Sequence, residues 1–327
     1  MKRHLRKVIV VMLVGVGLYG VFVLYAGYAQ IQKSLATFQY SAFLFALLLS
    51  SFNYGLRFLK WEYYLARLDV RGVPKLESLL VFLSGFVLTI TPGKVGEVFK
   101  SAVLAETHGV PAARTAPIIV AERLTDVIAV IALIVAGSSA FHGGLPWAIA
   151  GSAAVGLGMT LILWRTPALT AFAWLERGDT RLRDFAPKLR EGYESLRIVA
   201  TPSALLWPTF LSIIGWGAEG FALFLLLRGF GAPVDPALCV FFYATATLAG
   251  AIVPVPGGLG VAEALIQEQL VRLGGVAQGP ATASMILVRF ATLWWAVLVG
   301  FAALALLRVR FPTLLRDAPR DAPRDVA

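Results

Sequence analysis

The sequence has 327 residues, of which 58% are hydrophobic and 15% charged, and its mean hydropathy is +0.76. A soluble domain of this length would expose far more polar surface, so the composition excludes a soluble globular protein and predicts a membrane protein with several spans. The formal net charge is +10, but the basic residues gather at the ends of apolar stretches, which favours membrane orientation and anionic lipid over nucleic acid.

The chain carries few residues of the kinds that bind metals or form disulfides. Cys239 is the single cysteine, and His4, His108 and His142 are scattered along the chain. No disulfide and no thiolate or imidazole metal site can be assembled from them. A nucleotide-binding loop of the G-x-x-x-x-G-K-[ST] type is also missing. We therefore predict no catalytic residue, no metal ligand and no cofactor.

The first third of the chain predicts two spans. A basic N-terminus, Met1–Lys7, precedes an apolar run over about 8–28. This run predicts a retained span; a signal peptide is the alternative, although a signal core is usually only ~7–15 residues long. The second span is predicted over about 40–59. Arg57 and Lys60, at its end, are interpreted as side chains that reach the membrane surface.

Further apolar stretches predict more spans and two interrupted segments. In chain order these are a broken segment at about 76–106, spans at about 115–141, 147–164 and 202–227, a second broken segment at about 237–275, and a last span at about 280–307. The membrane domain is thus expected to cover 1–310. The tail, 311–327, is polar and proline-rich and is expected to be disordered.

A polar region, 165–200, separates the two groups of spans. Apolar residues recur in it at three- and four-residue steps, for example at Leu182, Phe185 and Leu189, with basic residues between them. This pattern predicts an amphipathic helix on the cytoplasmic membrane surface. A loop helix that packs on protein is the alternative.

Each broken segment contains proline and several glycines inside apolar sequence. Proline removes a backbone donor and glycine permits unusual backbone angles, so both segments are predicted to be interrupted helices. Such interruptions are tolerated at membrane depth where they line a cavity. The predicted helix-breaking residues are Pro92, Gly93 and Gly96 in the first segment, and Pro256, Gly257, Gly258 and Gly260 in the second.

The spacing of these segments predicts an internal repeat. Glu97 and Glu263 lie 166 residues apart, as do Arg123 and Arg289 (263 − 97 and 289 − 123). We expect one repeat at about 40–141 and the other at about 202–307, a pattern typical of transporters. Asn53 lies at the position equivalent to Glu219. Two ordinary Pro-Gly turns between spans are the alternative.

The distribution of basic residues predicts the topology. If both broken segments are re-entrant hairpins, the chain is an all-α polytopic membrane protein with six full transmembrane helices and both termini cytoplasmic. Only Lys33, Arg228 and Arg272 then fall outside, as the positive-inside rule requires. The second repeat would be inverted relative to the first, so the two hairpins would enter from opposite faces. We expect the cell (cytoplasmic or inner) membrane.

Ionised side chains within the apolar segments are the candidate substrate-binding and transport residues. They are Lys94, Glu97, Lys100, Glu122, Arg123, Asp126, Glu219, Glu263 and Arg289. Because each is costly at membrane depth unless paired or hydrated, we expect Arg123 to pair with Glu97 or Asp126, and Arg289 with Glu263. The groups either line a polar groove for a charged headgroup, relay protons, or form buried pairs that only fix helix register. Helix N-termini after the breaks are expected to offer free N–H groups to an anion.

Three motifs together resemble a known family. Thr91–Glu97, Glu122–Asp126 and Pro256–Gly260 followed by Glu263 resemble the flippase-like transmembrane region of lysylphosphatidylglycerol synthases, in a free-standing form. The resemblance extends over about 40–307 and implies a membrane protein that moves a phospholipid or polyprenyl-phosphate headgroup between leaflets. It does not extend to aminoacyl transfer, because no stretch could form the soluble synthase domain.

Three functions remain open from the sequence. The first is a lipid translocase whose partners are membrane lipids with an anionic headgroup. A membrane-embedded lipid-modifying transferase is the second, although no Asp-x-Asp motif or soluble catalytic domain supports an enzyme. The third is a non-catalytic partner of a separate lipid-synthesis enzyme.

Overall fold

The computed structural model describes residues 35–91, 97–138, 186–232, 234–253 and 255–314, together with positions 149 and 153. Every regular element in these ranges is helical. In chain order the elements are α3 Tyr40–Arg67, α4 Lys75–Ser84, η1 Gly85–Leu88, α5 Phe99–His108, α6 Ala112–Thr115, α7 Pro117–Ser138, α11 Ala186–Val199, α12 Pro202–Gly229, α13 Pro236–Ile252, η3 Pro256–Gly258, α14 Val261–Arg272, α15 Gln278–Arg289, η4 Phe290–Trp294 and α16 Trp295–Arg310.

Several of these helices suit a membrane. Among the described residues, Tyr40–Arg67, Pro202–Gly229 and Gln278–Arg310 are long and apolar enough to cross one, and Pro236–Ile252 is a shorter apolar helix. The predicted first span, the span at 147–164, the segment 165–185 and the tail beyond 314 lie outside the described residues. The same holds for Pro92, Gly93, Lys94 and Gly96 of the first break.

Local sequence signals explain where the helices begin and end. Pro202, Pro236 and Pro117 each occupy a first helical turn, where a missing N–H breaks no hydrogen bond. Asp235 caps α13 by accepting from the N–H groups of Ala237 and Leu238 at 2.8 and 3.2 Å. These local signals favour the observed starts of α7, α12 and α13.

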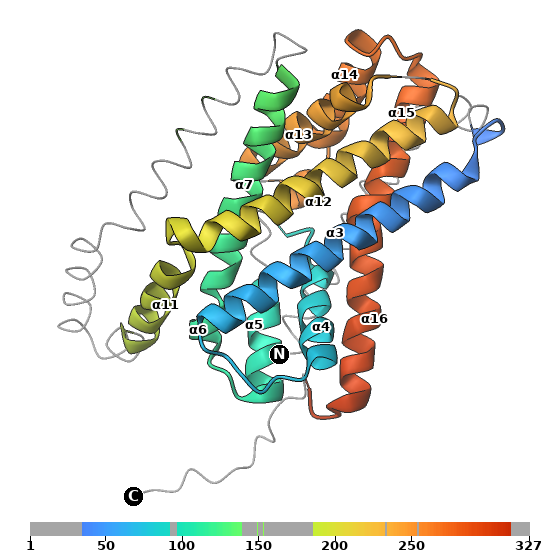
Figure 1. Cartoon of the computed structure of the whole chain (residues 1–327). Coiled ribbons are helices and arrows are strands. Elements are labelled where there is room, and N and C mark those ends of the chain that lie inside the picture. Colours follow the sequence, from blue (N-terminus) through green and yellow to red (C-terminus); the bar gives the residue numbers. More distant parts are fainter. Residues whose placement is uncertain are drawn as a thin grey trace, which may run out of the picture.

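The centre of the fold is the long pair α3 and α12, which lie side by side (Figure 1). They approach closely at Gly215, where an added Cβ would lie 2.1 Å from Oδ1 of Asn53. Small residues allow such close contact between apolar helices. Helix α3 extends to Arg67, eight residues beyond its predicted end, because polar residues of its last turns are buried inside the bundle.

Two helical hairpins flank this pair, at opposite ends of the molecule (Figure 1). In the first, α5 returns beside α4, and Nε2 of His108 at the end of α5 lies 2.9 Å from Oε2 of Glu77 at the start of α4. In the second, α14 returns beside α13, and Thr245 donates to Gln269 at 3.0 Å. The first hairpin packs against α16 and the second against α7, so each hairpin contacts a helix of the other half of the chain.

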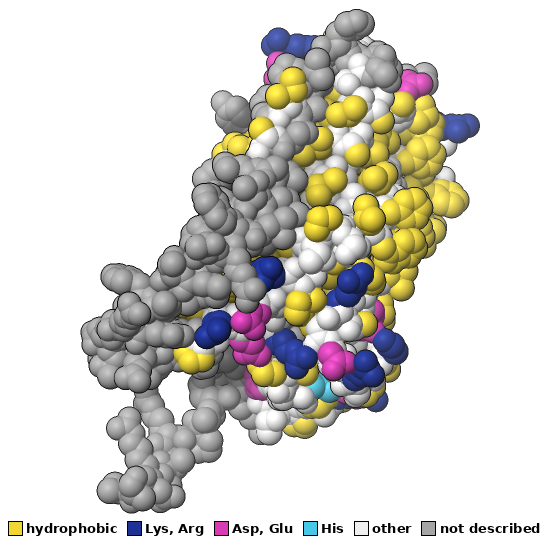
Figure 2. Space-filling view, turned by 60° about the vertical axis from the view of Figure 1, so that its left-hand side comes forward, with side chains coloured by type: hydrophobic (Ala, Val, Ile, Leu, Met, Phe, Trp, Pro, Cys, Tyr) yellow, Lys and Arg dark blue, Asp and Glu magenta, His cyan; other side chains and the backbone are white. Residues whose placement is uncertain are grey.

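The described surface carries an apolar band. Large hydrophobic side chains are exposed along α3, α12 and α16, including Leu48, Phe52, Phe210, Leu298 and Leu306. Figure 2 shows hydrophobic side chains over the middle of the described face, with charged side chains gathered towards its two ends. This is the surface that a helical bundle presents to lipid. Helix α11, which lies within the predicted amphipathic segment, packs against α6 and α7.

Candidate functional site

A cavity of about 310 Å³ lies between the two halves of the fold. Residues of α3, α7, α12, α13, α14, α15, η4 and α16 form its walls. Both hairpins reach it, through Thr89 and Thr91 on one side and Val255, Gly257 and Gly258 on the other. The hairpins also approach each other closely: a Cβ added at Gly257 would come into van der Waals contact with Ile90, 3.6 Å from its Cα. Five charged residues line the cavity: Arg57, Arg123, Asp126, Glu219 and Arg289.

Glu97 holds two arginines at the edge of the cavity. Nη2 of Arg57 lies 3.2 Å from both carboxylate oxygens of Glu97, and Nη2 of Arg123 lies 3.2 Å from Oε2. Arg123 also pairs with Asp126 at 3.1 Å. The expected pairs of Arg123 with Glu97 and Asp126 are thus both present. Glu97 is almost fully buried, so these contacts, and not water, stabilise its charge.

Two lysines neutralise the carboxylates of α7 from behind the cavity wall. Lys60 donates to Oδ1 of Asp126 at 2.8 Å and to Ser212 at 2.6 Å. Lys100 donates to Oε2 of Glu122 at 2.7 Å, and its Nζ lies 4.7 Å from the ring centroid of Trp61. Both lysines are 1% exposed, so their charges act within the protein and not at the membrane surface.

This burial corrects one sequence interpretation. Arg57 and Lys60 are not anchors that reach the membrane surface: they are buried and paired with Glu97 and Asp126. The reason is that α3 continues past its predicted end, which keeps both side chains inside the bundle. A signal was present, since Asn53, Arg57 and Lys60 recur at steps of four and three residues and so share one helix face.

The second half contains the equivalent of the Glu97–Arg123 pair. Arg289 donates from Nε to Oε1 of Glu263 at 2.6 Å, so the expected pair is present, and from Nη2 to the carbonyl oxygen of Gly257 at 2.7 Å. The partners are 26 residues apart in each pair. Glu263 and Arg289 together hold the second break against α15.

The second break has the backbone that its glycines predict. Gly257, Gly258 and Gly260 have φ values of 62°, 68° and 85°, a region that disfavours residues with a Cβ. The expected free N–H groups are absent at three of its amides: Gly258 and Leu259 donate to backbone carbonyls, and Gly260 donates to Oε2 of Glu263 at 2.7 Å. The carboxylate of Glu263 therefore occupies a position that we expected an anion to take.

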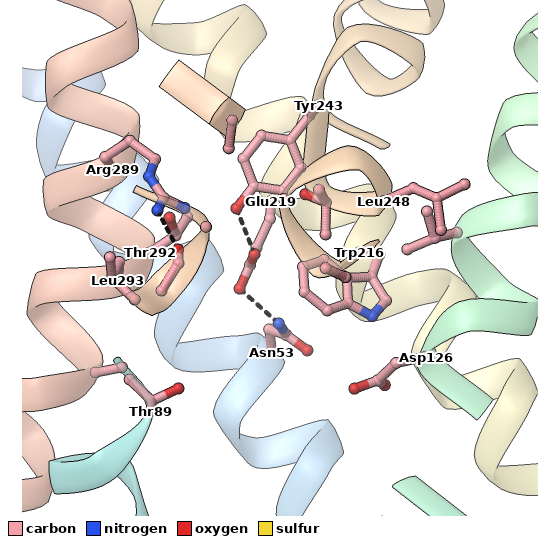
Figure 3. A pocket seen from close by; sticks show the side chains of 18 of the residues that line it. Asn53, Thr89, Asp126, Trp216, Glu219, Tyr243, Leu248, Arg289, Thr292 and Leu293 are labelled. Atoms are coloured by element: carbon pink, nitrogen blue, oxygen red, sulfur yellow. Dashed lines mark hydrogen bonds between the residues drawn. The ribbon is translucent and has the colours of Figure 1, made fainter. Parts of the chain in front are cut away.

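Glu219 and Asn53 meet where the two long helices cross. Nδ2 of Asn53 donates to Oε1 of Glu219 at 2.6 Å, and the hydroxyl of Tyr243 donates to Oε2 at 2.7 Å (Figure 3). Asn53 is 13 residues from the start of α3 and 14 from its end, so it lies roughly 20 Å from each end at about 1.5 Å per residue. The cavity is therefore deep within the apolar band.

The candidate residues from the sequence divide into two groups. Arg123, Asp126, Glu219 and Arg289 line the cavity, whereas Glu97, Lys100, Glu122 and Glu263 lie behind its wall. Sequence reasoning missed three aromatic lining residues, Tyr54, Trp216 and Tyr243. No signal marked them, because an aromatic residue within an apolar run is equally compatible with a lipid-facing position.

Comparison with known sequences finds similarity to membrane proteins. The sequence model of the family described as "Lysylphosphatidylglycerol synthase TM region" matches residues 11–300. A UPF0104 membrane protein of Methanocaldococcus jannaschii is 24% identical over 221 residues, which cover 66% of this chain and 91% of the relative. The family match spans both hairpins and every residue that lines the cavity.

Proposed function

The chain belongs to the lysylphosphatidylglycerol synthase transmembrane-region family, and from this premise we propose that it moves a lipid headgroup between the two leaflets of the membrane. The observation that carries the proposal is the cavity, which holds ionised side chains at the depth of the apolar band and is reached by both hairpins. A headgroup needs such a polar path, whereas its acyl chains can remain in lipid.

The proposal includes a topology with six full spans and two re-entrant hairpins in an inverted repeat. Three observations support it. The hairpins lie at opposite ends of the molecule (Figure 1), each packs against a helix of the other half, and Asn53 touches its own repeat equivalent. If a twofold axis relates the two halves, residues that contact their own equivalents lie close to that axis. Both termini are then on the cytoplasmic side of the cell membrane.

Ile90 of the first hairpin lies next to Gly257 of the second, which lines the cavity. For a headgroup to pass, the two hairpins must separate so that the cavity opens first to one leaflet and then to the other, as in transporters built from inverted repeats. The buried ion pairs keep each half rigid during this movement. Lys100 and Glu122 hold α5 against α7, and Glu263 and Arg289 hold α14 against α15.

Purified protein in liposomes tests the proposal. Phospholipid with a fluorescent acyl chain is placed in both leaflets, and the label in the outer leaflet is quenched by a membrane-impermeant reagent. With the wild-type protein, we expect the reagent to quench all of the label. With Arg123→Ala, the label in the inner leaflet should again be protected from the reagent. Arg190→Ala, on the exposed face of α11, is the matched control and should behave as the wild type. Label that stays protected with the wild-type protein would overturn the proposal.

A further inference from the structure

One carboxylate in the cavity differs from the others. Each of the other four buried carboxylates that we describe is within 4.0 Å of a lysine or arginine nitrogen; these are Glu97, Glu122, Asp126 and Glu263. Glu219 is 5% exposed and has no such cation among the described residues. Because an ionised carboxylate is costly to bury without a counter-charge, the missing cation needs an explanation.

The hydrogen bonds of Glu219 leave room for a further donor. Asn53 donates to one carboxylate oxygen and Tyr243 to the other. A carboxylate offers about four acceptor positions, so each oxygen retains one. Figure 3 shows the carboxylate between Asn53 and Tyr243, among the side chains that line the cavity. The free acceptor positions can therefore be used by a ligand in the cavity.

Aromatic rings beside Glu219 favour a cation there. Trp216 precedes Glu219 by one helical turn, and its ring centroid lies 6.4 Å from that of Tyr243. Both residues line the cavity (Figure 3). The face of an aromatic ring attracts an ammonium group within about 6 Å of its centroid. A carboxylate with two aromatic rings is a combination that binds an ammonium group.

Arginines line the same cavity. Arg57, Arg123 and Arg289 present guanidinium groups to it, and Nε of Arg123 makes no hydrogen bond within the described part of the chain. The planar guanidinium group matches the geometry of a phosphate. The cavity thus combines one position formed by a carboxylate and aromatic rings with other positions formed by arginines, within a volume of about 310 Å³. Small-molecule sites start at about 300 Å³, so this volume suits a headgroup without its acyl chains.

We propose that the cavity binds a zwitterionic phospholipid headgroup, with its ammonium group at Glu219, Trp216 and Tyr243 and its phosphate at the arginines. This assignment rests on the proposed lipid movement. It narrows the substrate class: the headgroup carries an ammonium group in addition to its anionic phosphate. Glu219 is then the counter-charge that selects the ammonium group. The arginines bind phosphate in any phospholipid.

Binding to purified protein in detergent tests the assignment without requiring transport. The protein is titrated with short-chain phosphatidylethanolamine or with short-chain phosphatidylglycerol of identical acyl chains. Binding is followed by the tryptophan fluorescence of the protein. The wild type should bind the ethanolamine lipid more tightly. Glu219→Gln, which keeps the shape but removes the charge, should weaken that binding about tenfold, the effect of losing one hydrogen bond between charged groups. Its binding of the glycerol lipid should stay within twofold.

Three controls make the test decisive. Glu219→Asp keeps the charge and should retain part of the preference, and Glu268→Gln, on the exposed face of α14, should change nothing. Equal binding of the two lipids by the wild type, or an unchanged preference in Glu219→Gln, would overturn the assignment. Soluble phosphoethanolamine should compete with the lipid for the cavity. If phosphoethanolamine binds but neither lipid does, the ligand is a free solute, and the assignment is also overturned.

The liposome assay separates this inference from the proposed function. If both lipids cross the membrane at the same rate in the wild type and in Glu219→Gln, lipid movement stands and the ammonium assignment falls. If the ethanolamine lipid binds in a Glu219-dependent way but no lipid crosses, the assignment stands and the transport function falls.

Discussion

Asn53 donates a hydrogen bond of 2.6 Å to Glu219, a residue 166 positions later in the chain. The same offset relates Glu97 to Glu263 and Arg123 to Arg289, so Asn53 and Glu219 are equivalent positions of the proposed repeat. Their contact joins the halves at the centre of α3 and α12, beside the cavity. The bond should therefore matter for stability as well as for the site.

Replacing Asn53 by leucine should destabilise the protein by about 1–3 kcal/mol, because Glu219 loses a buried donor. Glu219→Leu should cost a similar amount. The double variant should lose less than the sum of the two, since neither polar group is then left unpaired. Unfolding midpoints of the single and double variants in detergent give the coupling energy between the two side chains. Strict additivity would show that the two side chains do not stabilise each other.

Lys60 should be far more important for stability than an exposed lysine. Lys60→Met removes one of the two cations that Asp126 contacts and leaves Arg123, so the loss should lie near the lower end of the about 3–5 kcal/mol that breaking a buried pair costs. Lys75→Met is the matched control, because its side chain is 81% exposed and a surface pair contributes only about 0–1 kcal/mol. Equal loss in the two variants, measured by thermal unfolding, would contradict the buried position of Lys60.

Gly215 and Gly217 form a matched pair on α12. An added Cβ at Gly215 would collide with Asn53, whereas one at Gly217 would meet nothing within 4 Å. Gly215→Ala should therefore destabilise the protein by about 1–3 kcal/mol through overpacking. Gly217→Ala should stabilise it by up to about 1 kcal/mol, as alanine does in a helix. The opposite order of unfolding midpoints would show that α3 and α12 do not approach here.

The sequence predicted the second helix break, at Pro256–Gly260, because proline and glycine positions are local features. It also predicted the pairs of Arg123 and Arg289, since a charged side chain within an apolar segment is costly unless it is paired. It did not predict that Arg57 and Lys60 are buried, because a basic residue at the end of an apolar run looks the same whether it faces lipid headgroups or another helix. The role of Tyr243 beside Glu219 depends on packing between α12 and α13, which no local pattern encodes.

Arg289→Lys tests how the second break is held. Lysine cannot bond both Glu263 and the carbonyl oxygen of Gly257 as the guanidinium group does. We expect faster hydrogen exchange at the amides of Gly258 and Gly260, and slower lipid movement. Arg272→Lys, an exposed residue that pairs with Glu268, should change neither quantity. Unchanged exchange in Arg289→Lys would mean that Arg289 does not hold the break.

A reversible cross-link between the hairpins tests the central claim most directly. Ile90→Cys and Gly257→Cys place two thiols at the point where the hairpins touch, and native Cys239 is buried elsewhere. Each single cysteine variant controls for strain at its own position. In liposomes, oxidation of the double variant should stop lipid movement and a reducing agent should restore it, because the hairpins must separate for a headgroup to pass. Lipid movement that continues at an unchanged rate with the disulfide fully formed would contradict the account.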